Sequence, residues 1–198
     1  MTGTRPILTI GHSRHSWERF VELLGEARVD ALADIRSTPR SRFLPHFNRH
    51  QLAAALAARN IAYIFLGETL GGRPQNPELY SCGVADYEKM AASAEFRRGL
   101  AALIDEAGQH CVAVMCAEAD PLECHRCLLV GRALTDAGLE VRHILASGAI
   151  MTHVGAEDRL LELEHLAEES LLKVPRDELL AQAYRSRARK FAYTSQSG

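Results

Sequence analysis

The stretch CVAVMCAEADPLECHRCLLVGRAL, residues 111–134, joins a short apolar run to a second apolar segment through a polar turn. Its first seven residues are rich in valine and other apolar residues, which is typical of a buried strand. In the polar turn, Asp120 is a good N-cap, Pro121 suits the first helical position, and Glu123 stands where a capping box places its acid. The stretch therefore predicts a strand followed by a helix that starts at Pro121.

The same alternation of strand and helix repeats along the rest of the chain. Short apolar runs predict strands at 6–11, 29–35, 61–66 and 139–145, and helical spacing predicts helices at 16–27, 49–60, 94–107, 157–174 and 176–193. This order is typical of an α/β fold with an open, mainly parallel sheet, helices on both faces and Rossmann-like layering. We expect residues 1–154 to form this domain and residues 155–198 to form a C-terminal helical extension.

Composition limits the classes of function. The 198 residues are 47% hydrophobic and 24% charged, with a formal net charge of −2, so the chain offers no general attraction to nucleic acid or to an anionic membrane. No apolar run approaches the roughly 20 residues of a membrane span, and the N-terminus lacks a signal-peptide pattern. We therefore expect a cytoplasmic protein with no membrane partner, whose five cysteines are reduced.

Polar and reactive residues follow each predicted strand. These segments read GHSRHS, DIRSTPRSRF, LGETLGGRP, CAEADPLECHR and HILASGAIMTH in chain order. The carboxyl ends of parallel strands meet at one edge of a sheet, where loops converge and ligands bind. The sequence therefore predicts a functional site at that edge.

The same blocks resemble a known family. TIGHS, DIRSTPRS, YIFLGETLGGRP, CAEADPLECHR and VRHILASGAIMTH are similar in order and spacing to the domain of unknown function 488 family, over about residues 8–153. The resemblance implies an α/β fold. It implies no substrate and no reaction, because the family is uncharacterised.

The turn after residue 115 is the predicted reactive centre. A helix N-terminus carries a partial positive charge, which shifts a nearby thiol toward thiolate and attracts anions. The catalytic candidates are Cys116, Glu118, Cys124, His125 and Arg126. In this hypothesis one thiol is the nucleophile, either His125 or His12 is the acid or base that the glutamate orients, and the arginine holds an anionic group. The alternative is that both thiols pack in the core, as free cysteines often do.

Two further interpretations of the cysteines remain open. Cys124 and Cys127 form a C-x-x-C redox pattern, although such a pair normally begins right at the helix start. A zinc site would use these thiols with Cys116 and His125, but the second short ligand cluster that such sites usually have is missing, so no metal ligands are assigned. The sequence leaves the cofactor unknown. Cys127 also stands at helical spacing with apolar residues, which favours a core position.

The loop after the second predicted strand is the predicted anion-binding element. Its candidates are Asp34, Arg36, Ser37, Arg40, Ser41 and Arg42. Guanidinium and hydroxyl groups bind phosphate well, which favours anion binding by this loop. The plainer interpretation is a surface loop in which Asp34 and Arg36 pair with each other. Supporting candidates around the crevice are His12, Ser13, Gly71, Gly72 and His153. The basic run RSRARK, residues 185–190, is more typical of a solvated helix face than of a nucleic-acid site.

These observations predict a transferase or hydrolase that acts on a phosphate-bearing small molecule, a nucleotide or a nucleic-acid end. The competing class is a noncatalytic anion-binding or nucleotide-binding module that uses the same arginines while the thiols merely pack. A thiol redox protein is the third class. Selective reactivity of Cys116 or Cys124 distinguishes the first class from the second.

Overall fold

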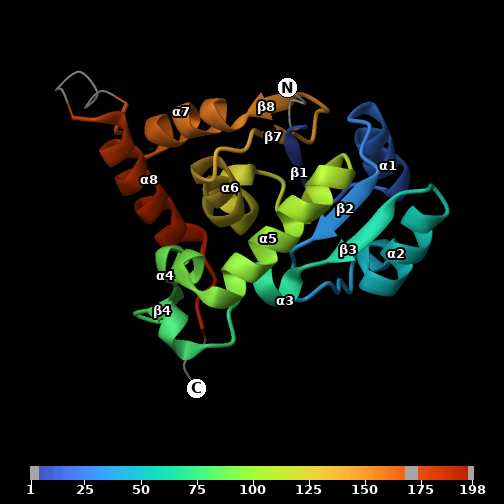
Figure 1. The fold of residues 1–198 in the computed structure, drawn as a ribbon, viewed down its shortest axis with the longest axis horizontal. Helices are drawn as coiled ribbons and strands as arrows, with labels where there is room; N and C mark the ends of the chain where they lie inside the picture. Colours follow the sequence, from blue (N-terminus) through green and yellow to red (C-terminus); the bar gives the residue numbers. More distant parts are fainter. Residues whose placement is uncertain (1–4, 168–173, 196–198) are drawn as a thin grey trace.

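The computed structural model describes residues 5–167 and 174–195 (Figure 1). The strands are β1 (Ile7–Gly11), β2 (Ala31–Asp34), β3 (Ala62–Phe65), β4 (Tyr80–Ser81), β5 (Val84–Ala85), β6 (Val112–Cys116), β7 (Val141–Ile144) and β8 (Ile150–Thr152). The α-helices are α1 (Trp17–Glu26), α2 (Arg49–Ala57), α3 (Gly67–Leu70), α4 (Tyr87–Ala92), α5 (Ala94–Gln109), α6 (Arg132–Asp136), α7 (His153–Leu163) and α8 (Arg176–Phe191). Short 3₁₀ turns are η1 (Pro45–Phe47), η2 (Pro77–Leu79) and η3 (Pro121–Glu123), and η4 (Arg126–Gly131) is a π-helix. In the described ranges no helix has the length and apolar character that crossing a membrane requires.

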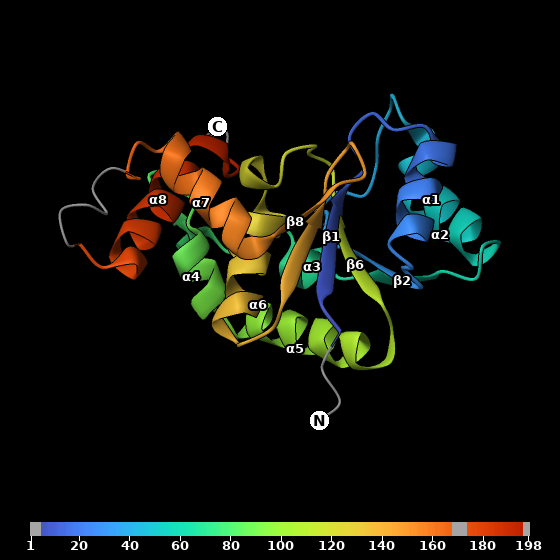
Figure 2. The ribbon, with the colours of Figure 1, turned by 90° about the horizontal axis from the view of Figure 1, so that it is seen from above.

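The main sheet has six strands in the order β3-β2-β6-β1-β7-β8. The first five strands of this order run parallel, and β8 pairs antiparallel with β7. Figure 2 shows α1 and α2 on one face of the sheet and α5 and α6 on the other. The predicted α/β fold with a mainly parallel sheet and helices on both faces is therefore confirmed.

Strand β8 corrects one expectation, because its residues were expected to be a loop. A tight turn follows β7, in which the amide of Leu145 donates to the carbonyl of Ala149 and Gly148 has a φ of 94°. Glycine adopts this left-handed conformation without a steric penalty. The chain can therefore reverse and add an antiparallel strand at the edge of the sheet.

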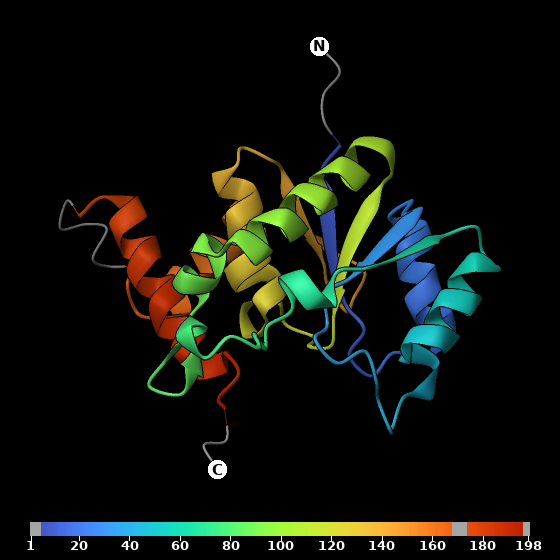
Figure 3. The same cartoon turned by 60° about the horizontal axis from the view of Figure 1, so that its bottom comes forward.

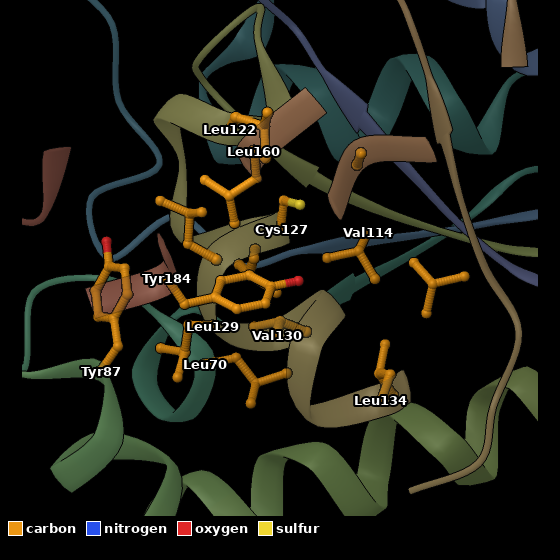
Figure 4. Packing of buried hydrophobic residues seen from close by; sticks show 14 of the residues in the cluster. Leu70, Tyr87, Val114, Leu122, Cys127, Leu129, Val130, Leu134, Leu160 and Tyr184 are labelled. Carbon is orange, nitrogen blue, oxygen red and sulfur yellow. The ribbon is translucent and has the colours of Figure 1, made fainter. Parts of the chain in front are cut away.

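Two apolar clusters enclose the sheet. On one face, Phe20, Leu24 and Leu52 pack against Leu8 and Ile10. The other cluster is larger and includes residues of β6, η4, α7 and α8. Figure 4 shows Cys127, Leu160 and Tyr184 among the side chains in its interior. Because both faces are buried, the central strands are almost continuously apolar, which is typical of parallel sheets.

The polar turn after β6 differs from the single helix that the capping pattern predicts. Asp120 is the N-cap as expected, since its side chain accepts from the amide of Leu122, but the turn η3 ends after Glu123. Cys124 is extended, with φ −143° and ψ 147°, and the π-helix η4 follows. This break lets the chain bring Cys124 back toward the end of β6.

The C-terminal segment packs onto the same core as the sheet. Helix α7 starts at His153 and ends at Leu163, earlier than the predicted 157–174, of which residues 168–173 lie outside the described part. Helix α8 follows Pro175 and buries Leu179, Leu180, Ala183 and Tyr184 in the larger cluster. Beyond it, Thr194 bridges to Val84, so the segment that follows α8 lies beside the β4–β5 hairpin (Figure 3).

Candidate thiol site at the carboxyl edge of the sheet

The parallel strands β1, β2 and β6 end together at one edge. Gly11 is in register with Cys116, and Asp34 with Met115. A cavity of about 280 Å³ opens at this edge, with Arg36, Ser37, Glu118, Cys124, His125 and Tyr193 among its lining residues. The five catalytic candidates from the turn after β6 lie together at or directly behind this wall.

Two thiols form the centre of the arrangement. The sulfur atoms of Cys124 and Cys116 lie 2.7 Å apart, and both residues are free cysteines. Cys116 is completely buried, whereas Cys124 is 2% exposed and lines the cavity, so Cys124 is the thiol that a ligand reaches. Burial raises the pKa of the Cys116 thiol well above its ordinary value, although the nearby charge of Arg126 acts in the opposite direction.

Glu118 completes this group on the cavity side. Its carboxylate and the two sulfur atoms all lie within 4.8 Å of one another. Desolvation opposes ionisation of this carboxyl group, but hydrogen bonds from the thiols of Cys124 and Cys116 outweigh it and lower the pKa of Glu118. The ionised carboxylate therefore accepts hydrogen bonds from both thiols.

Arg126 lies behind the thiols and is completely buried. Its Nη1 donates to the sulfur of Cys116 at 2.7 Å and to the carbonyl of Glu118 at 2.6 Å, and its Nη2 donates to the carbonyl of Ala119 at 2.9 Å. Desolvation lowers the pKa of Arg126, yet the charge of the neighbouring thiolates raises it overall. The guanidinium thus holds the turn and the thiol pair, and it does not face the cavity as an anion-binding group.

His125 forms a cysteine–histidine pair with Cys124. Its Nε2 lies 3.0 Å from the carbonyl of Ile35, which only accepts, so Nε2 carries the proton. Its Nδ1 is then the acceptor that lies 3.5 Å from the sulfur of Cys124. The amide of Arg126 also donates to this sulfur at 3.4 Å. A nucleophile, a base and a third group that orients the base are the parts of an activated nucleophile.

Two of the supporting candidates, Gly71 and Gly72, allow close approach of the backbone on the opposite wall. A Cβ on Gly72 would stand 3.0 Å from the ring of His125, and one on Gly71 would stand 2.3 Å from the hydroxyl of Ser37. These positions let the LGGRP segment pack directly against the thiol motif and the arginine loop.

Asp34 and Arg36 form an ion pair with each other, as the surface-loop interpretation of this segment predicts. The Asp34 carboxylate accepts from Nε of Arg36 at 2.9 Å and from Nη2 at 2.6 Å, and both residues are buried. The hydroxyl of Tyr63 also donates to this carboxylate at 2.7 Å. Burial, and then the charge of Asp34, raise the pKa of Tyr63. Arg36 therefore lines the cavity with its charge already neutralised.

The rest of the arginine loop stands apart from the cavity. The hydroxyl of Ser41 accepts from the amide of Leu44, which closes a local turn. Arg40 and Arg42 are exposed, and neither belongs to the described residues that line the cavity. Of the predicted anion-binding residues, Arg36 and Ser37 contribute to the wall.

Other lining residues were not predicted. Thr38 and Arg73 stand in segments that were singled out, whereas Phe191 and Tyr193 come from the C-terminal end of the chain. The amide of Arg73 donates to Ser37, and its guanidinium carbon lies 4.7 Å from the centroid of the Tyr193 ring. The proline and glycines around Arg73 gave a signal for this wall, but nothing in the sequence near Tyr193 did.

His12 and Ser13 support the edge without lining the cavity in the described structure. The ring of His12 stacks on Phe47 at 4.4 Å, and its Nδ1 lies 3.1 Å from the carbonyl of Ser13. Burial, and then the charge of Arg36, lower the pKa of His12 to about 4. His12 is therefore a neutral packing residue at pH 7 rather than the acid or base of the thiol.

The pKa of His12 predicts acid sensitivity of the fold. The folded value of about 4 is below the ordinary 6.5, so the unfolded chain binds the extra proton between these values and stability falls as the pH falls through this window. Protonation in the unfolded chain therefore lowers the stability of the folded state by up to about 3 kcal/mol near pH 4, and this loss disappears above about pH 6.5. Urea denaturation of wild type and His12→Asn at pH 7, 6, 5 and 4 measures it. We expect a shallower pH dependence for the variant, and an unchanged one for a variant of the exposed His50; equal slopes in all three would contradict the assignment.

His153 lies elsewhere than predicted. It is buried with His143 and Cys127 on the far side of the π-helix, and none of the three belongs to the described lining of the cavity. Cys127 therefore does not pair with Cys124, whose sulfur contacts Cys116. The basic residues of α8 are also engaged, since Arg185 contacts Glu88 and Lys190 contacts Glu164.

Comparison with known proteins identifies the class of the chain. A family model described as Domain of unknown function DUF488 matches residues 16–133, which is more than half of the chain. The chain belongs to this family. The matched region includes the arginine loop and the thiol motif, whereas TIGHS and VRHILASGAIMTH lie outside it. No curated protein and no solved structure gave a significant match.

Proposed function

We propose that the protein is a thiol-dependent transferase or hydrolase that acts on a phosphate-bearing small molecule, a nucleotide or a nucleic-acid end, with Cys124 as its nucleophile. The observation that carries the proposal is the pair of Cys124 and His125 at the cavity wall. The sulfur faces Nδ1 at 3.5 Å, and the carbonyl of Ile35 fixes the tautomer that leaves Nδ1 free to accept. Nucleophile, base and orienting group are the requirements of covalent catalysis by a thiol.

The reaction follows from this arrangement. The Cys124 proton passes to Nδ1 of His125, and the sulfur attacks the electrophilic atom of the substrate. As the bond to the leaving group breaks, His125 returns the proton to it. Water or a second acceptor then displaces the sulfur and regenerates the thiol. The amide of Arg126, 3.4 Å from the sulfur, supports its negative charge before and after attack.

The substrate class rests on the walls. A second cavity of about 570 Å³ adjoins the first, since both are lined by Ser37, Thr38, Arg73 and Tyr193. Hydroxyl groups and the guanidinium of Arg73 suit a phosphate, and the ring of Tyr193 offers a stacking face for a base. Because the mechanism needs free thiols, the proposal includes a reducing, cytoplasmic location.

Site-resolved alkylation tests the nucleophile. Native protein is treated with iodoacetamide at several pH values, and each cysteine is followed by mass spectrometry. We expect Cys124 to be labelled at least tenfold faster than Cys82, the exposed hairpin thiol, at pH 6. His125→Gln should remove most of this advantage, because it removes the base. Labelling of Cys82 ahead of Cys124 at every pH would refute the proposal.

Adduct trapping tests the substrate class. The protein is incubated with a panel of nucleotides and phosphorylated small molecules, quenched in acid and analysed for covalent mass at Cys124. We expect an adduct in wild type and in Cys82→Ser, and none in Cys124→Ser. Product formation by Cys124→Ser at the wild-type rate would show that another group performs the chemistry.

The noncatalytic binding module remains the second candidate, and Arg73 favours it. This cation stands between the two cavities beside the Ser37 hydroxyl, and it binds a phosphate whether or not the thiols react. Equilibrium binding of the same panel with unreactive thiols would favour the module. In either case Arg73→Ala should weaken binding at least tenfold, whereas Arg42→Ala, outside the lining, should not.

The thiol pair predicts a specific oxidation product. Hydrogen peroxide would convert Cys124 to a sulfenic acid with release of water, and the Cys116 thiol would displace a second water to form a disulfide. We expect non-reducing peptide mapping to find Cys116 joined to Cys124. In Cys116→Ser the sulfenic acid should persist and oxidise further. A disulfide between Cys124 and Cys127 would contradict the structure and support the redox pair that the sequence pattern indicates.

A further inference from the structure

Outside the thiol site, three metal-ligating side chains converge in the interior. Cys127 comes from the π-helix η4, His143 from β7 and His153 from the first residue of α7. The sulfur of Cys127 lies 3.7 Å from Nε2 of His143, and this nitrogen lies 3.0 Å from Nδ1 of His153. All three residues are buried in the larger apolar cluster, where Figure 4 shows the Cys127 sulfur among leucines and valines.

We propose that Cys127, His143 and His153 bind a zinc ion. Zinc in proteins takes thiolate and imidazole ligands, with Zn–S bonds of about 2.3 Å and Zn–N bonds of about 2.0 to 2.1 Å. Around a tetrahedral ion these lengths set ligand atoms roughly 3.3 to 3.6 Å apart. The observed separations of 3.7 and 3.0 Å differ from this by a few tenths of an ångström. Small side-chain rotations would bring these three ligands to the required separations, and water would take the fourth position around the ion.

In each histidine, the outer ring nitrogen, which faces away from the proposed zinc ion, has a hydrogen-bond partner, as is typical of metal sites. Nδ1 of His143 lies 2.8 Å from the hydroxyl of Thr9, and Nε2 of His153 lies 3.0 Å from the hydroxyl of Tyr184. Tyr184 in turn donates to Glu157 at 3.2 Å. Metal-bound histidines almost always donate their second N–H to such a partner, which fixes the tautomer and orients the ring. A threonine hydroxyl and a tyrosine hydroxyl can each accept a hydrogen bond, so both outer nitrogens can carry the ring proton, and a bound ion would replace the contact between the two inner nitrogens.

The local backbone brings these groups unusually close. η4 is a π-helix, a rare geometry that is frequent at functional sites, and it contains Cys127. The ring of His153 lies against Gly131, where a Cβ would be 3.1 Å from Cε1. Apolar residues at positions 127, 143 and 153 would fill this part of the core without placing polar atoms beside one another. Packing alone therefore does not explain why these positions hold a cysteine and two histidines.

The proton balance of binding is simple. Burial lowers the pKa of His143 to about 3 and that of His153 to about 4, so both rings are neutral and offer lone pairs at pH 7. Burial raises the pKa of the Cys127 thiol to about 12, and a coordinated cation reverses this because a metal-bound thiol is deprotonated. Each zinc ion that binds therefore releases one proton.

Titration with the metal alone tests the proposal. Protein stripped with a chelator is titrated with Co²⁺ and then with Zn²⁺. We expect one ion per chain, with thiolate-to-cobalt charge transfer and tetrahedral visible bands that Zn²⁺ abolishes. Cys127→Ser should lose the charge-transfer band, and Thr9→Val should weaken binding by about 10- to 100-fold. Cys124→Ser is the matched control in the other sulfur cluster and should bind cobalt as wild type does.

Each alternative outcome is decisive. Loss of the cobalt bands in Cys124→Ser, with full retention in Cys127→Ser, would move the metal to the thiol site and overturn the proposal. No uptake by folded wild type would overturn it as well. X-ray absorption on zinc-loaded wild type needs no variant: we expect one sulfur and two imidazole nitrogens, and two sulfurs would refute the assignment. Because the proposed nucleophile is Cys124, failure of either proposal leaves the other intact.

Discussion

Replacement of Arg126 by methionine is expected to lower the free energy of unfolding by about 3 to 5 kcal/mol, because two carbonyls and the Cys116 sulfur lose their hydrogen-bond donor. Arg126 is completely buried and donates to the sulfur of Cys116 and to the carbonyls of Glu118 and Ala119. Methionine fills much of the volume but donates nothing. Both carbonyls then lose their donor in the interior, at a cost of about 1 to 3 kcal/mol each.

Urea denaturation of Arg126→Met and wild type measures this loss. The matched control is Arg98→Ala, at an exposed position in the helix α5, which we expect to change stability by less than about 0.5 kcal/mol. The same variant should also lose the preferential alkylation of Cys124, because the turn that presents the thiol is no longer held. A stability loss below about 1 kcal/mol would mean that the guanidinium contacts are not what organises this turn.

Gly11→Ala is expected to destabilise the protein by about 3 kcal/mol, at the upper end for overpacking. A Cβ on this residue would stand 1.8 Å from the carbonyl oxygen of Glu118 and 2.9 Å from Nη1 of Arg126. The first contact is with backbone, which no side-chain rotation relieves. The turn after β6 must move away from β1, and the hydrogen bonds of Arg126 stretch with it.

A second glycine provides the control for this variant. Gly25 is exposed in α1, and nothing lies within 4 Å of the place where its Cβ would stand. Gly25→Ala should therefore stabilise the protein by about 0.5 to 1 kcal/mol, the usual gain of alanine over glycine in a helix. Thermal unfolding of the two variants should shift in opposite directions. Equal shifts would show that the close approach at Gly11 is unimportant.

Most of the fold could be predicted because its strands are short apolar runs that alternate with helical patterns. β8 could not, since Ile150–Thr152 is too short to give a period and depends on the turn at Gly148. The π-helix could not either, because its apolar spacing is also compatible with an α-helix, and capping by Asp120 favours a continuous helix. The extended conformation of Cys124 depends on tertiary contacts that no local pattern records.

The candidate site was predictable where its residues are neighbours in the chain. Cys116, Glu118, Cys124 and His125 lie in one motif, and the strand order places that motif at the carboxyl edge. The contacts of a charged side chain depend on three-dimensional packing. The sequence therefore gave no signal that Arg126 donates to two carbonyls and a sulfur. The cluster of Cys127, His143 and His153 joins three elements, and only the completed fold shows that they face one another.

Thr194, which pairs with Val84 in the folded protein, is made late in the synthesis of the chain. A growing chain presents both thiols of the motif well before Phe191 and Tyr193, which complete the cavity wall, are made. Domains begin to form from the N-terminal side while the ribosome is still adding residues. The nascent protein therefore passes through a stage in which Cys124 lies beside an incomplete cavity wall. That wall is complete only when the last turn of α8 and the residues after it dock onto the hairpin.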